Sequence, residues 1–448
     1  MLFGLFGKLS FKGGVHPPHH KHSTQSVPIQ ELPPPPALVI PLSQHLGAPA
    51  AAVVKKGDQV KIGQVLAEAG GFVSAPVHAS VSGKVTGVGA SPHPSGKHVT
   101  AVEIENDTTD ARVDFSGINW REDAPQAIVN RIADAGIVGM GGASFPSHVK
   151  LSPPSNKPID TLILNGAECE PYLTADHRIM LEQTDAIILG MQILKKALNA
   201  HRVFIGIEDN KPDAIAKLEE AIRAGSYENT SVARLRAKYP QGGEKQLIQA
   251  VTRRQVPSGG LPMDVGCVVH NVGTALAVWD AVINGVPLYQ RVVTVTGPTV
   301  GKPSNLLVRI GTPVRSVLEH CETDLDRTKK VIMGGPMMGL ALPEIDAPVV
   351  KSTSGILALD TTTPAVRAHD CISCGNCVKA CPIHLMPSVL GKLVDREMYD
   401  DADRYNVLDC IECGSCAYVC PSKINLVHFM KLGKYHVTAA RKAARKKQ

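Results

Sequence analysis

The sequence predicts a multidomain α/β protein, in which a small β domain precedes a larger α/β domain and a helical, cysteine-rich domain lies near the end of the chain. Short alternating strands between turn residues fill residues 37–115. Strands then alternate with helices over residues 116–285. Eight of the eleven cysteines fall within residues 371–420, in two copies of one spacing. These three changes of pattern divide the chain.

Length and composition fit a globular protein with several domains. The chain has 448 residues, 44% of them apolar, and this length predicts roughly three or four domains. The net charge of +6 is modest and concentrated in the last residues, so nucleic-acid binding is not expected. No apolar stretch approaches the ~18 residues of a transmembrane helix, and Met1–Phe11 lacks the length and cleavage site of a signal peptide.

The two ends of the chain are predicted to lie outside the folded domains. Residues 1–36 are expected to form an irregular arm, because the prolines at Pro17 and in Pro33–Pro36 do not allow a helix. Residues 431–448 are expected to form a basic tail. Such a tail is usually solvated, and contact with anionic lipid or a partner is the alternative.

Residues 37–115 are predicted to form a small β domain. Turn residues at Gly57–Asp58 and Gly63 lie between alternating apolar positions. The pattern resembles the barrel-sandwich hybrid fold of biotinyl and lipoyl carrier domains. Those domains carry a modified lysine in a Met-Lys-Met or Asp-Lys-Ala tripeptide, and neither tripeptide occurs in this chain. We therefore expect a structural or docking module.

Residues 116–285 are predicted to form a Rossmann-like α/β domain. Apolar strands run into polar or glycine-rich loops, and amphipathic helices separate them. Such a sheet binds ligands at the carboxyl ends of its strands. The expected helices span 126–135, 178–198 and 212–224, and the expected strands span 161–164, 203–207, 232–235 and 266–270.

The loops at these strand ends carry the residues that suit a flavin nucleotide. Gly139, Gly141 and Gly142 lack side chains, so backbone N–H groups can approach a phosphate. Lys150 offers a cation for the phosphate or a flavin carbonyl. The asparagines at 165 and 271 suit the flavin ring edge or ribityl hydroxyls, and the glutamates at 168, 170 and 244 suit ribose hydroxyls or a carboxamide.

Residues 286–345 are predicted to form a β-grasp domain that bridges its neighbours. Arg291–Gly297 alternates in polarity, Val314–His320 has helical spacing, and Lys330–Gly339 closes the segment. Residues 346–370 are expected to be a linker to the cysteine-rich domain.

Residues 371–430 contain two Cys-x2-Cys-x2-Cys-x3-Cys-Pro runs, and this spacing holds [4Fe–4S] clusters in bacterial ferredoxins. Disulfides would suit a small secreted domain, and structural zinc would use two pairs of ligands, so neither explains the spacing. The segment Val389–Val394 between the runs has helical spacing, which favours a helical two-cluster ferredoxin domain. The expected ligands are Cys371, Cys374, Cys377, Cys381, Cys410, Cys413, Cys416 and Cys420.

The ligand sets are expected to cross between the runs, because the fourth cysteine of such a run usually binds the other cluster. Cys420 would then complete the cluster of the first run, and Cys381 would complete the cluster of the second. Oxygen-sensitive clusters in a chain without a secretion signal indicate a reducing cytoplasm.

Four loops of the α/β domain resemble the NADH-oxidising flavoprotein of respiratory complex I. Gly139–Lys150 is similar to its Gly-Arg-Gly-Gly-Ala-Gly-Phe-Pro-Thr-Gly-x-Lys motif. Asn165–Pro171 resembles its Asn-x-Asp-Glu-x-Glu-Pro motif. Gly242–Glu244 stands where that family has Cys-Gly-Glu-Glu, and Asn271–Thr274 where it has Asn-Val-Glu-Thr.

This resemblance implies an FMN site against which NADH stacks. Met140 replaces the motif's Arg and Ala167 replaces its Asp, and the complex I flavoprotein holds one cluster where this chain has two. The cofactor-binding residues that the resemblance implies are Gly139, Gly141, Gly142, Lys150, Asn165, Glu168, Glu170, Gly243, Glu244, Asn271 and Thr274.

The order of domains over essentially the whole chain resembles the RnfC (RsxC) family of the Rnf (Rsx) electron transport complex. That family implies a peripheral subunit on the cytoplasmic side of the cell inner membrane, with other subunits of the complex, including an iron–sulfur protein, as partners. It also implies electron exchange between NADH and ferredoxin, coupled elsewhere in the complex to movement of Na+ or H+.

Three functions follow from these observations. The first is an NADH-linked oxidoreductase subunit with FMN and two [4Fe–4S] clusters, in which no residue acts as an acid or base. The second is a soluble cobalamin reductase with a similar flavin domain. The third is a docking and relay subunit, in which Met140 and Ala167 mark the loss of the NADH site.

Overall fold

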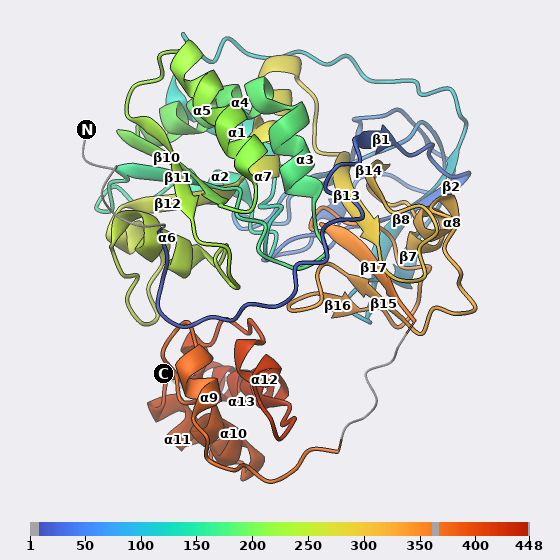
Figure 1. The fold of residues 1–448 in the computed structure, drawn as a ribbon. Coiled ribbons are helices and arrows are strands. Elements are labelled where there is room, and N and C mark those ends of the chain that lie inside the picture. The colour runs from blue at the N-terminus through green and yellow to red at the C-terminus, as the bar shows by residue number, and fades with distance from the viewer. Residues whose placement is uncertain (1–8, 361–366, 447–448) are drawn as a thin grey trace.

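The structure is a computed structural model that describes residues 9–360 and 367–446. Three β-containing domains pack together, and a helical domain lies beneath them (Figure 1). Within the described residues, no helix is long and apolar enough to cross a membrane. Residues 1–8 of the predicted arm, 361–366 of the predicted linker and 447–448 of the predicted tail lie outside the described part.

The first domain is a pair of small antiparallel sheets around one apolar core. One sheet has the order β2-β8-β7-β4 and the other β3-β5-β6. Buried Leu38, Leu66 and Val85 belong to their common core, and the alternating sequence pattern supplies them. The strands are β2 (Ala37–Pro41), β3 (Ala51–Ala52), β4 (Gln59–Val60), β5 (Val65–Glu68), β6 (Val77–His78), β7 (Gly83–Pro92) and β8 (His98–Asn106).

The second domain is a parallel sheet of order β11-β10-β9-β12 between helices. Its strands are β9 (Thr161–Asn165), β10 (Arg202–Glu208), β11 (Thr230–Leu235) and β12 (Cys267–Asn271). Its helices are α1 (Pro125–Asp134), α2 (Ser147–Lys150), α3 (Ala175–Glu182), α4 (Thr184–Leu198), α5 (Pro212–Ala224), α6 (Glu244–Thr252) and α7 (Val272–Trp279).

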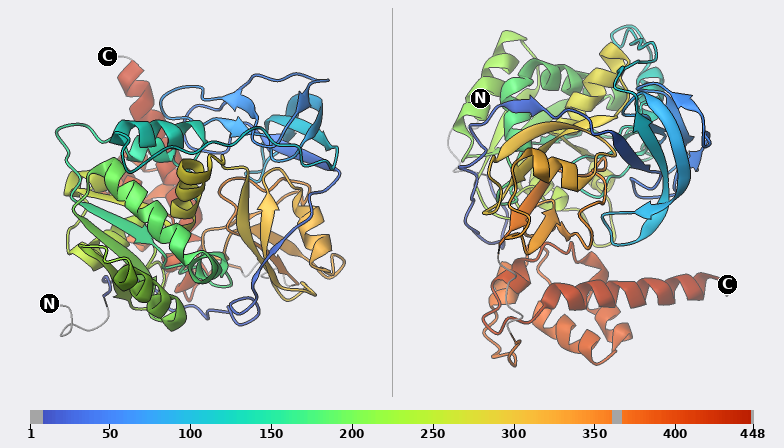
Figure 2. Two further views of the ribbon diagram at one scale, coloured as in Figure 1. Left: turned by 90° about the horizontal axis from the view of Figure 1, so that it is seen from above. Right: turned by 90° about the vertical axis from the view of Figure 1, so that its right-hand side faces the viewer.

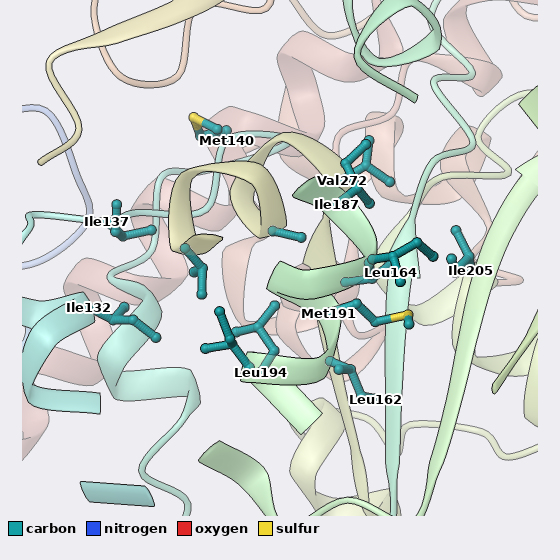
Figure 3. Packing of buried hydrophobic residues seen from close by; sticks show 14 of the residues in the cluster. Ile132, Ile137, Met140, Leu162, Leu164, Ile187, Met191, Leu194, Ile205 and Val272 are labelled. Atoms are coloured by element: carbon teal, nitrogen blue, oxygen red, sulfur yellow. The ribbon is translucent and has the colours of Figure 1, made fainter. Parts of the chain in front are cut away.

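Helix α4 covers the middle of this sheet and packs closely on α7. Gly190 permits the approach, because a Cβ atom there would lie 2.0 Å from the Ala275 carbonyl oxygen. Figure 3 shows side chains of α4 meeting those of β9 in this core. The prediction of one helix over 178–198 is wrong in its continuity, because Gln183, with φ −124° and ψ 34°, separates α3 from α4.

The third domain is a mixed sheet of order β1-β14-β13-β17-β15-β16. Its strands are β1 (Ile29–Glu31), β13 (Gln290–Thr296), β14 (Ser304–Arg309), β15 (Lys330–Met333), β16 (Leu340–Ala341) and β17 (Gly355–Leu359), and its helix is α8 (Val314–His320). The predicted linker is wrong at β17, which pairs with both β13 and β15. Because both faces of β17 are covered, its sequence lacks the alternation that identifies a half-exposed strand.

The N-terminal arm runs along the underside of the body, between it and the helical domain (Figure 1). Leu9 pairs with Leu235, Val15 with Tyr239, and β1 with β14. The Gly14 amide also donates to the Ala380 carbonyl of the helical domain at 2.9 Å. The irregular path was expected, but the arm ends as an edge strand.

The helical domain consists of α9 (Asn376–Ala380), α10 (Pro387–Asp395), α11 (Tyr399–Arg404), α12 (Ser415–Tyr418) and α13 (Leu426–Lys446). The prediction of a tail from residue 431 is wrong over most of its length. Met430 and Val437 of α13 are buried in the core of this domain. Their helical spacing continues through the basic residues, which conceal it. The far end of α13 projects from the domain (Figure 2).

Candidate functional site

The predicted loops meet at the carboxyl edge of the parallel sheet. Asn165 and Asn271 end the neighbouring strands β9 and β12 and are paired in register. The Asn165 side-chain amide donates to the Gly242 carbonyl at 2.8 Å, which joins the β9 loop to the loop before α6. The Asn271 side-chain oxygen accepts from the Gly273 amide at 2.8 Å and so caps α7.

Lys150 and Glu244 form an ion pair across this edge, with 2.7 Å between the Lys150 Nζ and Glu244 Oε1 atoms. The Lys150 ammonium group also donates to the Val269 carbonyl at 3.1 Å. The two side chains are 27% and 39% exposed, so they remain within reach of a ligand. The pair brings the glycine-rich loop and the start of α6 together.

The glycine-rich loop presents its backbone to solvent. Gly141 and Gly142 are exposed, and a Cβ atom on Gly142 would meet nothing within 4 Å. Met140 is buried in the core of the α/β domain, where Figure 3 shows its side chain, and its amide donates to the Thr274 hydroxyl at 3.0 Å. The change from Arg to Met therefore anchors the loop and leaves its glycines available.

Glu168 and Glu170 are occupied by main-chain hydrogen bonds. The Glu168 carboxylate accepts from the Asp176 amide at 2.7 Å and the His177 amide at 3.3 Å, at the start of α3. The Glu170 carboxylate accepts from the Met337 and Met338 amides at 3.0 and 2.8 Å, and burial raises its pKa to about 7. These two carboxylates brace loops in this structure, unlike Glu244.

Two residues that the sequence analysis missed hold the same edge. Lys21 of the arm is buried, and its ammonium group donates to the carbonyls of Glu168, Glu170 and Leu173. Burial lowers the pKa of Lys21 to about 8. Asp176 accepts from the Asn271 side chain at 2.7 Å, and burial together with the nearby Glu168 raises its pKa to about 7. Neither lies in a recognisable motif.

The eight cysteines of the helical domain line two cavities. One cavity of about 740 Å³ is lined by Cys371, Cys374, Cys377 and Cys420. The other, of about 370 Å³, is lined by Cys381, Cys410, Cys413 and Cys416. Each cavity thus brings together three thiols of one run and the fourth thiol of the other, which is the grouping that crossed ligation requires.

The chemistry of both cavities fits a [4Fe–4S] cluster, because each offers four sulfur donors. Backbone amides also point at the sulfurs: Leu385 N lies 3.3 Å from Cys381 Sγ, and Glu412 N lies 3.4 Å from Cys410 Sγ. Such hydrogen bonds tune cluster potentials. Burial raises the pKa of Cys410 to about 11, so a bound metal is needed for this thiol to ionise at neutral pH.

The two cavities differ in their surroundings. Cys413 of the second run packs in one apolar cluster with Val15 and Tyr239, and Cys169 and Met337 pack against this cluster. Cys169 itself accepts from the Gly242 amide at 3.3 Å, at the edge of the sheet. In the first run, by contrast, Ile372 is 68% exposed and Cys374 is exposed. The second-run cavity therefore faces the α/β domain, and the first-run cavity faces solvent.

Fold and site together define an iron–sulfur protein in which an α/β nucleotide-type domain is joined to a helical two-cluster domain. Comparison with family models agrees domain by domain. The Nuo51 FMN-binding domain matches residues 132–280, the RnfC barrel sandwich hybrid domain 9–109, the SLBB domain 292–341 and the 4Fe-4S dicluster domain 364–421.

Comparison with curated proteins shows the family. The chain is 49% identical to the RnfC-type component of the proton-translocating ferredoxin:NAD(+) oxidoreductase complex of Clostridium ljungdahlii, over 96% of this chain and 94% of that protein. It is 48% identical to the Na(+)-translocating counterpart of Acetobacterium woodii, over 97% of this chain and 98% of that protein. The chain belongs to the RnfC family, whose members are components of ion-translocating ferredoxin:NAD+ oxidoreductase complexes.

Solved structures support the fold. An NAD+-reducing [NiFe]-hydrogenase in its H2-reduced state aligns with a TM-score of 0.50 and 19% identity, over 72% of this chain and 62% of that chain. The barrel-sandwich, α/β, β-grasp and two-cluster domains predicted from the sequence are thereby confirmed as the fold class.

Proposed function

We propose that this chain is the NADH-linked electron-transfer subunit of a membrane-bound ion-translocating ferredoxin:NAD+ oxidoreductase complex. The observation that carries the proposal is the direct packing of the cofactor edge of the α/β domain on the second-run cysteine cavity, through Cys169, Tyr239 and Cys413. The identities of 49% and 48% to RnfC proteins of such complexes support it.

The residues at the sheet edge are suited to hold FMN, which on binding supplies a hydride acceptor that passes electrons on singly. Gly139, Gly141 and Gly142 offer main-chain N–H groups to the phosphate. The remaining proposed contacts come from side chains and glycine of the other loops: Lys150, Asn165, Gly243, Glu244, Asn271 and Thr274. Because hydride transfer needs no acid or base, these residues only bind and orient.

The two clusters act in a fixed order in this proposal. The cluster bound by Cys410, Cys413, Cys416 and Cys381 receives electrons first, because its cavity contacts the α/β domain. The cluster of Cys371, Cys374, Cys377 and Cys420 follows and delivers electrons outward, since its cavity lies beside the exposed Ile372. The receiver is another iron–sulfur protein of the complex.

The protein associates peripherally with the cytoplasmic side of the inner membrane in this proposal, and ion movement belongs to other subunits. The relay-only function differs in one measurable respect, which is reduction by NADH. The cobalamin reductase hypothesis is disfavoured by the match of residues 9–109 to the RnfC barrel sandwich hybrid domain.

The test is an anaerobic NADH titration of reconstituted protein, followed by optical and EPR spectra. We expect flavin bleaching and reduction of both clusters in the wild type. Lys150→Ala should slow bleaching at least tenfold while dithionite still reduces both clusters. Lys157→Ala is the matched control, because its ion pair with Asp264 lies outside the proposed site. A wild-type flavin that NADH does not bleach would favour the relay-only function.

A further inference from the structure

Phe72 is an exposed aromatic ring on the barrel-sandwich domain that no part of the proposed mechanism uses. It lies between β5 and β6, and its side chain is 67% exposed. Among the described residues it is the only phenylalanine with an exposed side chain. An exposed ring of this size is costly unless it meets an aromatic or apolar partner.

The loop that carries Phe72 is held firmly from behind. The Val73 carbonyl accepts from the Ala48 amide at 3.0 Å, and the Ser74 hydroxyl donates to the Ala48 carbonyl at 2.8 Å. The Gly70 amide donates to the same hydroxyl at 2.9 Å. Gly47, at φ +110°, allows this contact, since a Cβ atom there would lie 1.9 Å from the Val73 carbonyl oxygen. The ring is therefore presented on a braced loop.

Phe72 lies against the glycine-rich loop of the other domain. The His148 Nε2 atom donates to the Phe72 carbonyl at 3.0 Å. The two rings meet edge to face, with 6.0 Å between their centroids and an interplanar angle of 87°. His148 belongs to α2, which also carries Lys150. The exposed ring thus lies beside the outer end of the proposed FMN and NADH loop.

We propose that Phe72 stacks on the adenine ring of NAD(H), so that the barrel-sandwich domain supplies part of the dinucleotide site. This inference rests on the proposed function. The nicotinamide must reach the flavin at the sheet edge, and the adenylate half then extends outward past the glycine-rich loop. A purine has two apolar faces, and aromatic side chains are its usual stacking partners.

The partly exposed neighbours of Phe72 suit the same half of the ligand. Phe145 and His148 are both half-buried and lie on the same loop, three residues apart. Gly141, Gly142 and Ala143 are exposed next to them and leave main-chain N–H groups open to a pyrophosphate. An aromatic rim beside an open glycine backbone is the surface that an adenine nucleotide needs, whereas a protein partner would need a broader apolar patch.

The test measures NADH binding to flavin-free protein by nucleotide fluorescence, alongside NADH oxidation kinetics of the loaded protein. Phe72→Ala should weaken NADH binding on the order of tenfold, because one base–aromatic stack is lost. Phe72→Trp should restore it. Reduced nicotinamide mononucleotide, which lacks adenine, should show the same KM with wild type and Phe72→Ala. Val53→Ala, an exposed apolar residue of the same domain at 51% exposure, is the control and should change neither ligand.

The outcomes separate this inference from the function beneath it. Wild-type protein that binds NADH no more tightly than Phe72→Ala would overturn the stacking role and leave the proposed function standing. Equal losses for both nucleotides would also overturn it, since the ring would then act on the loop alone. Wild-type protein that neither binds NADH nor bleaches would refute both. Intact NADH binding with weaker assembly into the complex would overturn the stacking role and assign Phe72 to a partner protein.

Discussion

Replacing Cys381 with Ser should remove the cluster of the second run, although Cys381 lies in the first. The structure places its thiol in the cavity of Cys410, Cys413 and Cys416. With one of four ligands lost, iron per chain should fall by roughly half, from two clusters to one. Cys420→Ser should lose the same amount of iron from the other cavity.

The two variants should differ when NADH is the reductant. In Cys381→Ser the missing cluster is the one that contacts the α/β domain, so NADH should still bleach the flavin but no longer reduce the remaining cluster, which dithionite reduces. In Cys420→Ser the contact through Cys413 remains, and NADH should still reduce the second-run cluster. The two clusters can be followed by EPR during NADH titration.

Iron analysis and EPR decide between crossed and uncrossed ligation. If Cys381→Ser kept a cluster with the spectral features lost in Cys420→Ser and lost the other, crossed ligation would stand. If Cys381→Ser and Cys371→Ser lost the same cluster, the crossing would be refuted. Cys321→Ser, a buried cysteine of the β-grasp domain outside both cavities, serves as the control and should keep full iron.

Three further changes test how the cofactor edge is held. Lys21→Ala should lower the free energy of unfolding by roughly 2–5 kcal/mol, because buried carbonyls of Glu168 and Glu170 lose their donor, whereas Lys12→Ala should have little effect; calorimetry or chemical denaturation measures both. Glu170→Gln should flatten the decline of stability between about pH 4.3 and pH 7. The raised pKa of Glu170 makes its contribution full below the unfolded pKa and lost as pH rises through about 7, by up to roughly 3 kcal/mol. An unchanged pH profile of melting temperature would contradict this assignment. Gly190→Ala should destabilise the α/β domain by roughly 1–3 kcal/mol, since its Cβ atom would lie 2.0 Å from the Ala275 carbonyl oxygen, while Gly89→Ala, with open space around it, should not.

Local patterns predicted the elements whose faces differ in environment. Helices α5 and α8 appear at the expected residues, since each has one apolar face and a polar one. Strand β17 was missed because both of its faces are covered and its sequence, Gly355–Leu359, carries no period. Helix α13 was cut short because its basic residues suggested a solvated tail.

The candidate site shows a similar division. Cysteine spacing indicated the ligand groups, since the spacing itself encodes the wrapping of a cluster. Glu168 and Glu170 were predicted to meet a ligand, and their carboxylates instead accept main-chain amides. Lys21 and Asp176 could not be foreseen, because their roles depend on partners about 150 and 95 residues away along the chain.

The docking of the N-terminal arm bears on how this protein is made. The arm leaves the ribosome first, yet Leu9 pairs with Leu235, β1 with β14, and the Gly14 amide with the Ala380 carbonyl. Contacts this distant in sequence form slowly, and domains synthesised earlier fold before later ones emerge. The arm must therefore wait, unattached, until the first cysteine run has been translated. Its seating beside Ala380 then becomes a late step of biogenesis, which a cell lacking iron would leave incomplete, with the arm open to proteolysis.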